Sequence, residues 1–372
     1  MKFMSKVIYI VKSKLHFYPP CVTQIRLLKQ LGLEIEVLFG SCSDTVTDIF
    51  EKEGIPYKKL CDKRDVFHGT LDKLNNYYCF RRTLIKELKN RDLENTLLWF
   101  GNAETLLSMK GTSFLKKNKY AITFLELLDD NPFRMRMLRP LAIRAKFNLA
   151  CEETRAYLMK FWWGLEMLPY VMPNKPFDCP KKVLELTDEN VIALLNEIGN
   201  KKIILYQGII KEYDILRNFT TAIKELDDNY VLLLMGPDPE NIFSKIKNIT
   251  NKVIYSPYIT APNHLQVTSR AFAGIVFYNG DSTLNRAFCA PNKIYEYGAF
   301  GIPMIANAIP GLTKTVGACG AAVCTKLSVE DIVRSVRYID SNYDRMTKAS
   351  RDFYKSTDIF NIMKEIVKEQ KL

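Results

Sequence analysis

Strand-like segments alternate with helix-like segments along this chain, and the alternation stops once and then starts again. Segments rich in β-branched and aromatic residues occur first at 6–11, 34–39, 96–100, 120–125 and 147–151. The same pattern returns after residue 200, at 202–206, 230–235, 253–255, 273–277 and 304–306. Alternation of this kind builds a parallel sheet with helices on both faces. We therefore predict an α/β fold with two Rossmann-like domains.

The break in the pattern is rich in proline. Residues 171–180 contain three prolines in ten positions, which is typical of a linker. A chain of 372 residues also exceeds what one ordinary core accommodates. We predict an N-terminal domain over residues 1–175, a C-terminal domain over 176–355 and a terminal helix within 356–372.

The net charge of +12 is concentrated in the first half. Residues 1–175 hold 29 Lys and Arg against 19 Asp and Glu, whereas the remainder holds 24 against 22. A basic domain indicates an anionic partner, such as nucleic acid, an acidic membrane surface or a phosphorylated substrate. A solvated face without a partner is the alternative. No helix-turn-helix, RRM or zinc signature is found, so we do not expect a nucleic-acid partner.

Two further features of the composition bear on the location of the protein. No apolar run approaches the roughly 20 residues that cross a bilayer. Nine cysteines are scattered without a CxxC pair, and the three histidines do not pair with them at zinc spacing. Reduced thiols in a cytoplasmic protein are the simplest interpretation.

The segment 285–306 contains the most informative chemistry. Pro291 suits the first position of a helix, because its missing N–H would have no intrahelical partner there. The amides of Asn292 and Lys293 would then form an anion site at the positive end of the helix. Glu296 lies about 4.5 Å further along the axis, where a carboxylate can accept from two ribose hydroxyls. The alternative is an ordinary amphipathic helix with a surface Lys–Glu pair, and the residues alone favour that simpler interpretation.

Several motifs in this half, taken in order, resemble those of family 4 retaining glycosyltransferases, which have the GT-B fold. The resemblance covers about residues 202–323, and it lies in Tyr-Gln-Gly at 206–208, Leu-Met-Gly-Pro at 234–237 and the run from Pro291 to Pro303. The N-terminal half is less similar, and residues 20–39 match the family's first helix and second strand. The resemblance implies two Rossmann-like domains with a cleft between them. It also implies that the terminal helix packs back on the N-terminal domain.

This family transfers a sugar from a nucleotide-activated donor to an acceptor hydroxyl with retention of configuration. By resemblance, Glu296 holds the ribose and Gly208 lies beside the diphosphate. Such enzymes usually need no bound metal or other cofactor, and stabilisation of the departing diphosphate is the main catalytic task. The groups that we expect to reach the phosphates are Lys211 or Arg217, supplemented by Asn292 and Lys293.

The acceptor is expected on the N-terminal domain. Glu126 falls near an acidic position of the family and is our candidate for orienting the acceptor, while Lys293 is the candidate for stabilising the leaving group. The expected partners are a nucleotide sugar and a glycan or lipid-linked acceptor, in the synthesis of surface polysaccharide or glycolipid.

The sequence departs from the family at several positions, and Ser13-Lys14 stands where the family has a Gly-Gly loop after its first strand. Phe288 replaces the first of two glutamates that are usually eight positions apart. Ile209 stands where an arginine is common, and Asp214 and Ile215 occupy later positions that are usually basic. Two other functions therefore remain as alternatives: a nucleotide-sugar epimerase, and a degenerate protein that binds nucleotide sugars without turnover.

A cationic and apolar segment at 134–147 indicates a membrane contact. Cations alternate there with methionine, leucine and isoleucine, and the arginines are Arg134, Arg136, Arg139 and Arg144. Such a helix can lie in a membrane interface, which predicts a peripheral location on the inner face of the plasma membrane. The alternative is a buried helix whose arginines surround the acceptor or pair with acids. We expect the aromatic run 161–163 to form core or interdomain packing.

Overall fold

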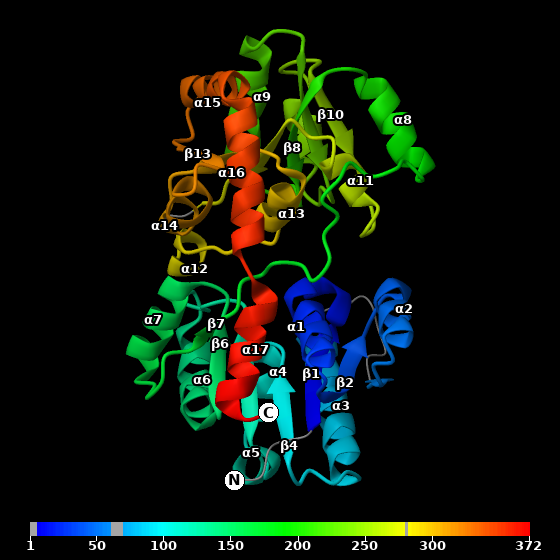
Figure 1. The fold of residues 1–372 in the computed structure, drawn as a ribbon, viewed down its shortest axis with the longest axis vertical. Helices are drawn as coiled ribbons and strands as arrows, with labels where there is room; N and C mark the ends of the chain where they lie inside the picture. Colours follow the sequence, from blue (N-terminus) through cyan, green and yellow to red (C-terminus); the bar gives the residue numbers. More distant parts are fainter. Residues whose placement is uncertain (1–5, 61–69, 280–281) are drawn as a thin grey trace. The chain divides into compact units, whose positions relative to one another are not determined.

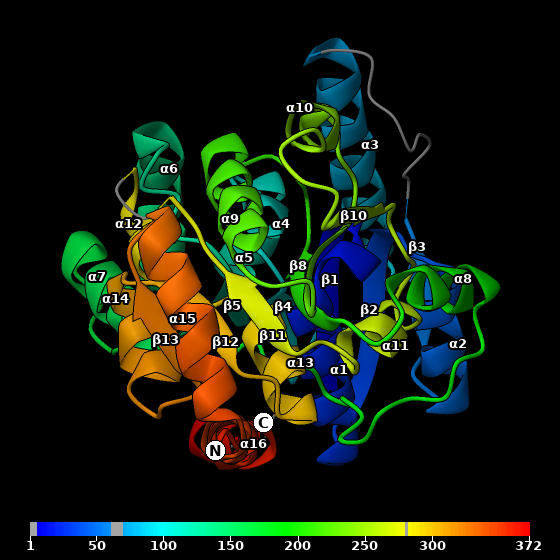
Figure 2. The same cartoon turned by 90° about the horizontal axis from the view of Figure 1, so that it is seen from above.

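A computed structural model of the protein describes residues 6–60, 70–279 and 282–372, and Figure 1 and Figure 2 show its ribbon from two directions. The chain divides into two compact units. Unit 1 contains residues up to Phe177, the short segment Thr283–Asn285, and Asp358–Leu372. Unit 2 contains Asp178–Ser282 and Arg286–Thr357. The sequence placed the boundaries after residues 175 and 355 and did not assign 283–285 to the first unit.

Unit 1 is built on a seven-stranded sheet in the order β3-β2-β1-β4-β5-β6-β7, and every strand pair is parallel. The strands are β1 (Lys6–Lys14), β2 (Glu34–Ser41), β3 (Tyr57–Lys59), β4 (Thr96–Phe100), β5 (Tyr120–Phe124), β6 (Phe147–Ala150) and β7 (Tyr170–Val171). The helices are α1 (Pro19–Gln30), α2 (Asp44–Lys52), α3 (Thr70–Lys89), α4 (Ala103–Ser108), α5 (Phe114–Lys117), α6 (Pro132–Arg144), α7 (Glu153–Trp163) and α17 (Ile359–Gln370), with a 3₁₀ turn at Leu15–Phe17.

The sheet of unit 1 separates two apolar cores. Ile8 and Ile10 of β1 face one core, which α3 to α7 cover, whereas Val7 and Tyr9 face the other core under α1, α2 and α17. A strand that is buried on both faces has a continuous apolar sequence. For this reason polar and apolar residues do not alternate along β1 and β4. The predicted α/β class follows from this arrangement.

Unit 2 repeats the plan with a six-stranded sheet in the order β10-β9-β8-β11-β12-β13, again with parallel pairs. The strands are β8 (Lys202–Gln207), β9 (Tyr230–Met235), β10 (Val253–Ser256), β11 (Ala273–Val276), β12 (Met304–Asn307) and β13 (Ala322–Thr325). The helices are α8 (Glu189–Ile198), α9 (Tyr213–Glu225), α10 (Ile242–Ile246), α11 (His264–Thr268), α13 (Lys293–Phe300), α14 (Pro310–Leu312), α15 (Val329–Ser341) and α16 (Tyr343–Ser356), with a π turn at Thr313–Gly317. The short helix α12 (Leu284–Ala287) is divided between the two units. Two parallel sheets flanked by helices confirm the predicted fold class.

The terminal helix α17 belongs to unit 1, although α16 immediately before it belongs to unit 2. Ile359, Met363 and Ile366 of α17 are buried in the core that also contains α1. The Tyr170 hydroxyl donates to Glu369 Oε2 at 2.7 Å. These contacts hold the end of the chain against the first sheet.

The segment Thr283–Asn285 is fixed by side chains of unit 1. The Asp129 carboxylate accepts from the amides of Leu284 at 2.5 Å and Asn285 at 3.2 Å. Arg155 is buried and donates to the Asn285 carbonyl. A charged acceptor and a buried guanidinium form strong hydrogen bonds, so this tripeptide is firmly held.

Three expectations from the sequence can be compared with the structure. No helix in the described part of the chain is long and apolar enough to span a membrane. Cys79 on α3 is disulfide-bonded, so the expectation of reduced thiols is wrong at this position. Seven other cysteines among the described residues form no disulfide, and Cys61 lies outside those residues. Within the run 161–163, Trp163 is buried as expected, whereas Phe161 is 86% exposed and does not form core packing.

Candidate functional site

Two glycines bring backbone close to backbone at the carboxyl ends of β8 and β9. Gly208 and Gly236 have φ angles of 129° and 145°, which side chains rarely permit. A Cβ on Gly236 would lie 2.0 Å from the Gly208 carbonyl oxygen. The Gly208 amide donates to the Met235 carbonyl at 3.0 Å, which keeps the two ends aligned. The turn after β8 therefore presents bare backbone at the edge of the sheet where α/β proteins bind ligands.

The helix α13 begins at Lys293, with Asn292 as its N-cap. Pro291 was predicted at the first helical position, but it lies just before the helix. Neither the Asn292 nor the Lys293 amide donates a backbone hydrogen bond within the described residues. Both amides thus remain available to an anion at the positive end of the helix.

Small residues fix where α13 lies. The Tyr297 ring covers Gly274 of β11, where a Cβ would come within 2.3 Å of the ring. The Tyr297 hydroxyl donates to the Leu205 carbonyl at 3.3 Å. On the other side, a Cβ on Gly298 would come within 3.2 Å of the Ser350 carbonyl of α16. The helix start is therefore held at the ends of β8 and β11 by close packing.

Lys293 is the cation at the centre of this group. Its Nζ donates to the Gln207 carbonyl at 2.7 Å and lies 5.1 Å and 5.5 Å from the ring centroids of Tyr206 and Tyr278. A Cβ on Gly208 would lie 3.7 Å from the same Nζ. The ammonium is thus placed beside the bare backbone of the turn after β8.

The surroundings of Lys293 lower the pKa of its side chain. Burial lowers the pKa of Lys293 to about 8, because the charged form loses solvation. The nearby Glu296 carboxylate opposes this shift without cancelling it. At neutral pH the side chain is therefore still mainly protonated, and it loses its charge at a lower pH than an ordinary lysine.

The Glu296 carboxylate is held by a chain of hydrogen bonds. Gln207 Nε2 donates to Glu296 Oε2 at 2.5 Å, and the Thr268 hydroxyl donates to Gln207 Oε1 at 2.8 Å. His264 Nε2 lies 3.7 Å from Glu296 Oε1. Because Gln207 uses both of its amide atoms, its orientation is fixed, and it fixes that of the carboxylate.

Electrostatics keeps Glu296 ionised in this partly buried position. Burial alone would raise its pKa, but His264, Gln207 and Lys293 together hold the pKa below its ordinary value. An ionised carboxylate accepts hydrogen bonds and donates none. The group can therefore bind a pair of hydroxyls next to an anion that Lys293 and the helix start would receive.

The carboxyl edge of the first sheet holds a second polar group, in unit 1. Lys12 at the end of β1 pairs with Glu104 at 3.0 Å, and the Ser13 hydroxyl donates to the other Glu104 oxygen at 3.4 Å. Glu126 is exposed after β5. Burial, with Glu104 and Glu126 adding to it, raises the pKa of Tyr18. These side chains form the polar edge on which an acceptor is expected.

Solved structures provide comparisons at low identity. The chain is similar to Anabaena Alr3699/HepE in complex with UDP and glucose, at 12% identity and a TM-score of 0.72, covering 98% of this chain and 99% of that one. A glycosyltransferase from Rickettsia africae matches at 14% and 0.66, covering 98% and 97%. A putative UDP-N-acetylglucosamine 2-epimerase from Listeria monocytogenes matches at 12% and 0.68, covering 98% and 96%. No protein-family model and no curated protein sequence matches.

The chain has the GT-B fold. The match covers both sheets, their helices and nearly the whole length of the chain. The sequence motifs had indicated this fold mainly for the second half of the chain.

The structure brings some of the predicted donor-site residues together and leaves others apart. Those that share the site at the start of α13 are Gly208, Asn292, Lys293 and Glu296. Lys211 and Arg217 are exposed, and among the described residues neither side chain makes a hydrogen bond or ion pair with that group. Their phosphate role stays a prediction. A different cation reaches the turn after β8, since Arg286 Nη1 lies 3.7 Å from Glu212 Oε1.

Three members of the site were not predicted from the sequence. Gln207, Thr268 and His264 organise Glu296, and the histidines had been weighed only as zinc ligands. Gln207 lies within the Tyr-Gln-Gly motif at 206–208, and this was the one signal in the sequence that pointed to the group.

The four arginines of α6 divide into two pairs. Arg139 Nε donates to the last carbonyl of α7 at 3.3 Å, and Arg144 Nε donates to the Leu115 carbonyl in α5 at 2.8 Å. These two satisfy carbonyls of neighbouring helices, a structural task that the sequence did not predict. Arg134 and Arg136 are exposed, and their side chains make no hydrogen bond or ion pair among the described residues.

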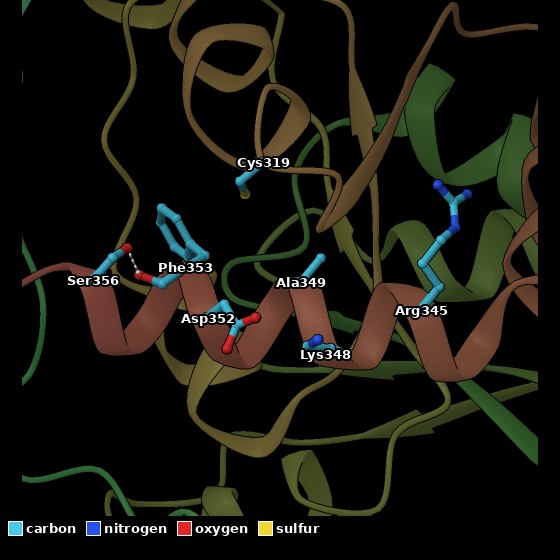
Figure 3. A pocket seen from close by; sticks show the side chains of 7 residues that line it. All are labelled: Cys319, Arg345, Lys348, Ala349, Asp352, Phe353 and Ser356. Atoms are coloured by element: carbon cyan, nitrogen blue, oxygen red, sulfur yellow. Dashed lines mark hydrogen bonds between the residues drawn. The ribbon is translucent and has the colours of Figure 1, made fainter.

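A hollow of about 350 Å³ lies beside α16, and Figure 3 shows the side chains around it. Its lining consists of Cys319, Arg345, Lys348, Ala349, Asp352, Phe353 and Ser356. None of these belongs to the group around Lys293, and the lining holds a single carboxylate. The hollow is therefore not the candidate site.

Proposed function

We propose that the protein is a glycosyltransferase that uses a nucleotide-sugar donor, with UDP as its nucleotide. The observation that carries the proposal is the joint placement of Lys293, Glu296 and the bare backbone of Gly208 at the start of α13. A diphosphate at the helix start meets two amides and an ammonium. The ribose one turn further along meets a preoriented carboxylate. UDP is the nucleotide named for the HepE complex, which has the same fold.

The chemistry that this arrangement supports is departure of the diphosphate. Negative charge grows on the leaving oxygen as the bond to the sugar breaks, and donors that are already in place stabilise that charge without rearrangement. Lys293 and the amides of Asn292 and Lys293 are such donors. The transfer is retaining, as in family 4, and Glu126 in unit 1 orients the acceptor hydroxyl.

The acceptor proposed is a glycan or a lipid-linked sugar of a surface polysaccharide or glycolipid, reached from the cytoplasmic side of a membrane. A lipid-linked acceptor requires the enzyme to approach the bilayer, and the basic half of the chain suits that location. No metal or other cofactor is assigned to the reaction.

The test begins with binding. Thermal unfolding of the protein is measured with UDP, GDP, CMP and dTDP and with their sugar conjugates. Ligand at about 100 times its dissociation constant adds roughly 2.7 kcal/mol to stability, which a melting curve detects. We expect a shift with UDP compounds that is lost in Glu296→Ala.

The matched control is Glu225→Ala, which removes an exposed glutamate at the end of α9 in the same unit. This variant should keep the full shift with UDP. If Glu296→Ala binds UDP as tightly as the wild type, the ribose assignment is wrong.

Turnover separates the three possible functions. Loss of UDP-sugar that depends on an added acceptor supports the transferase. Epimerised or free sugar formed without any acceptor supports the epimerase, whose fold is also represented among the similar structures. Binding without turnover under any acceptor condition supports the degenerate alternative, which Phe288 and Asp214 motivate.

A further inference from the structure

Gln207, the last residue of β8, contacts α13 through both its backbone and its side chain. Its carbonyl accepts from Lys293 Nζ at 2.7 Å, and its side-chain Nε2 donates to Glu296 Oε2 at 2.5 Å. The group assigned to the diphosphate and the group assigned to the ribose are therefore attached to different parts of one residue. A change in the Gln207 side chain can disturb the carboxylate and leave the ammonium in place.

Gln207 is the closer of two side chains that flank the Glu296 carboxylate. Its Nε2 lies 2.5 Å from Oε2, whereas His264 Nε2 lies 3.7 Å from Oε1. A short hydrogen bond to a charged group is strong, so the bond from Gln207 sets the direction of the carboxylate. The Glu296 side chain is still 17% exposed, so lone pairs of its oxygens remain accessible to a ligand.

Thr268 holds the other atom of the Gln207 amide. Its hydroxyl donates to Gln207 Oε1 at 2.8 Å, and both residues are buried. A buried amide oxygen that loses its donor is destabilised, because water does not replace the missing hydrogen bond. Without the Thr268 hydroxyl, the Gln207 side chain would therefore shift toward other conformations. Thr268 thus keeps Nε2 directed at Glu296.

The helix α11, which carries Thr268, is fixed from its other side. Gln266 is also buried and lies about 200° around the helix from Thr268. Its Oε1 accepts from the Thr187 amide and its Nε2 donates to the Thr187 hydroxyl, both at 2.9 Å. Arg270 donates to the Leu184 carbonyl at 2.7 Å. The segment before α8 therefore holds α11, and with it the Thr268 hydroxyl, in one position.

We propose that Gln207 and Thr268 are positioning residues that make the donor site select ribose over 2′-deoxyribose. Thr268 orients Gln207, and Gln207 orients the carboxylate that accepts from both ribose hydroxyls. A carboxylate that is free to turn binds this pair more weakly, because its orientation must then be fixed on binding. The inference rests on the proposed function, since it takes Glu296 as the ribose ligand of a nucleotide donor.

The test compares UDP with 2′-deoxy-UDP in calorimetric titrations of the full-length protein. A hydrogen bond to a charged group changes affinity by roughly tenfold to a hundredfold, so the wild type should prefer UDP by about that ratio. Thr268→Val removes the hydroxyl and keeps a similar shape. It should weaken UDP by about fivefold to tenfold and 2′-deoxy-UDP by less, so the ratio falls. Thr268→Ser, which keeps a hydroxyl, should retain the ratio.

A second variant and a third ligand separate this role from general damage to the site. Gln207→Leu removes the donor to Glu296 and should lower the ratio of UDP to 2′-deoxy-UDP at least as far as Thr268→Val does. The Gln207 carbonyl that holds Lys293 is unchanged in both variants. The preference for UDP over UMP, which reports binding of the second phosphate, should therefore stay as in the wild type.

The matched control is Thr220→Val on α9. Thr220 is fully buried like Thr268, and its hydroxyl donates to the Leu216 carbonyl at 2.8 Å. Removing this hydroxyl makes the same chemical change elsewhere in unit 2 and should leave both ligand ratios unchanged. Thermal unfolding without nucleotide shows that each variant is folded. If Gln207→Leu does not fold, the pair Thr268→Val and Thr268→Ser decides the question.

An unchanged ratio of UDP to 2′-deoxy-UDP in folded Thr268→Val and Gln207→Leu would overturn the proposal and leave the proposed function intact. An equal fall in the ratio of UDP to UMP would also overturn it, because the damage would then not be confined to the ribose. Equal binding of UDP and 2′-deoxy-UDP by the wild type would remove the ribose assignment and this proposal with it. A wild type that binds no nucleotide would overturn the proposed function itself, and the inference with it.

Discussion

Replacing Lys293 with methionine should stabilise the protein near neutral pH while weakening its binding of a nucleotide diphosphate. The ammonium lies in a partly buried position beside the rings of Tyr206 and Tyr278 and donates to the Gln207 carbonyl. Methionine has a similar length and no charge. The substitution therefore removes the cation and keeps most of the packing.

The magnitude follows from the pKa of Lys293, which burial lowers to about 8 from its ordinary 10.5. Between these values the unfolded state binds more protons than the native state, so the free energy of unfolding rises with pH in that window. At about 1.4 kcal/mol per unit, the charged side chain destabilises the native state by about 3 kcal/mol at pH 7. Less than half of that destabilisation remains at about pH 9.5. Loss of the hydrogen bond to Gln207 costs about 1 kcal/mol, so the net gain at pH 7 is about 2 kcal/mol.

The assay is urea unfolding of wild type and Lys293→Met at about pH 7 and about pH 9.5. The stability difference between the two proteins should shrink by about 2 kcal/mol over this interval, because other titrating groups cancel in the comparison. Lys293→Met should also give a smaller thermal shift with UDP. Lys364→Met, an exposed change, should show no such pH dependence. A pH-independent difference, or a variant less stable than wild type at neutral pH, would refute the reasoning.

Three further predictions concern the two units. Gly236→Ala should lower the free energy of unfolding by at least about 3 kcal/mol, because the new Cβ meets the carbonyl of the turn after β8. Gly199→Ala, where the new Cβ has open space, should lower it by about 1 kcal/mol. Equal losses for the two variants in urea unfolding would contradict this prediction. Asp129→Ala should speed hydrogen exchange of the Leu284 amide by roughly tenfold or more while the β1 amides keep their protection; unchanged exchange would show that the carboxylate does not hold the segment. Affinity for UDP, titrated by calorimetry, should fall as the pH rises through about 8, because Lys293 then loses its charge; constant affinity up to about pH 9.5 would remove Lys293 from the phosphate site.

The fold could be predicted because parallel sheets leave a strong pattern in the sequence. Buried strands such as β4 and β9 have the bounds that the apolar runs predicted, 96–100 and 230–235. The short strands β3, β7 and β13 were missed, because segments of two to four residues carry little pattern. The assignment of 283–285 to unit 1 depends on Asp129, more than 150 positions away, and local pattern does not contain that information.

The site was predictable where one helix carries it. Lys293 and Glu296 share α13, so their spacing alone put them within one turn of each other. Gln207, Thr268 and His264 reach Glu296 from β8 and α11, and only the folded sheet brings those elements together.

Ile209 and Asp214 stand where the family that the sequence resembles commonly has basic residues, and Lys293 places a cation beside the same turn. Basic residues in the turn after β8 would approach a diphosphate from that turn, yet Lys293 reaches the same place from α13 and donates to the carbonyl just before it. Arg286 also approaches the turn, through Glu212. Among the described residues, the cation that hydrogen-bonds to the end of β8 therefore comes from α13. An arginine keeps its charge at any pH that a folded protein meets, whereas burial lowers the pKa of Lys293 to about 8, so the charge that α13 supplies depends on pH.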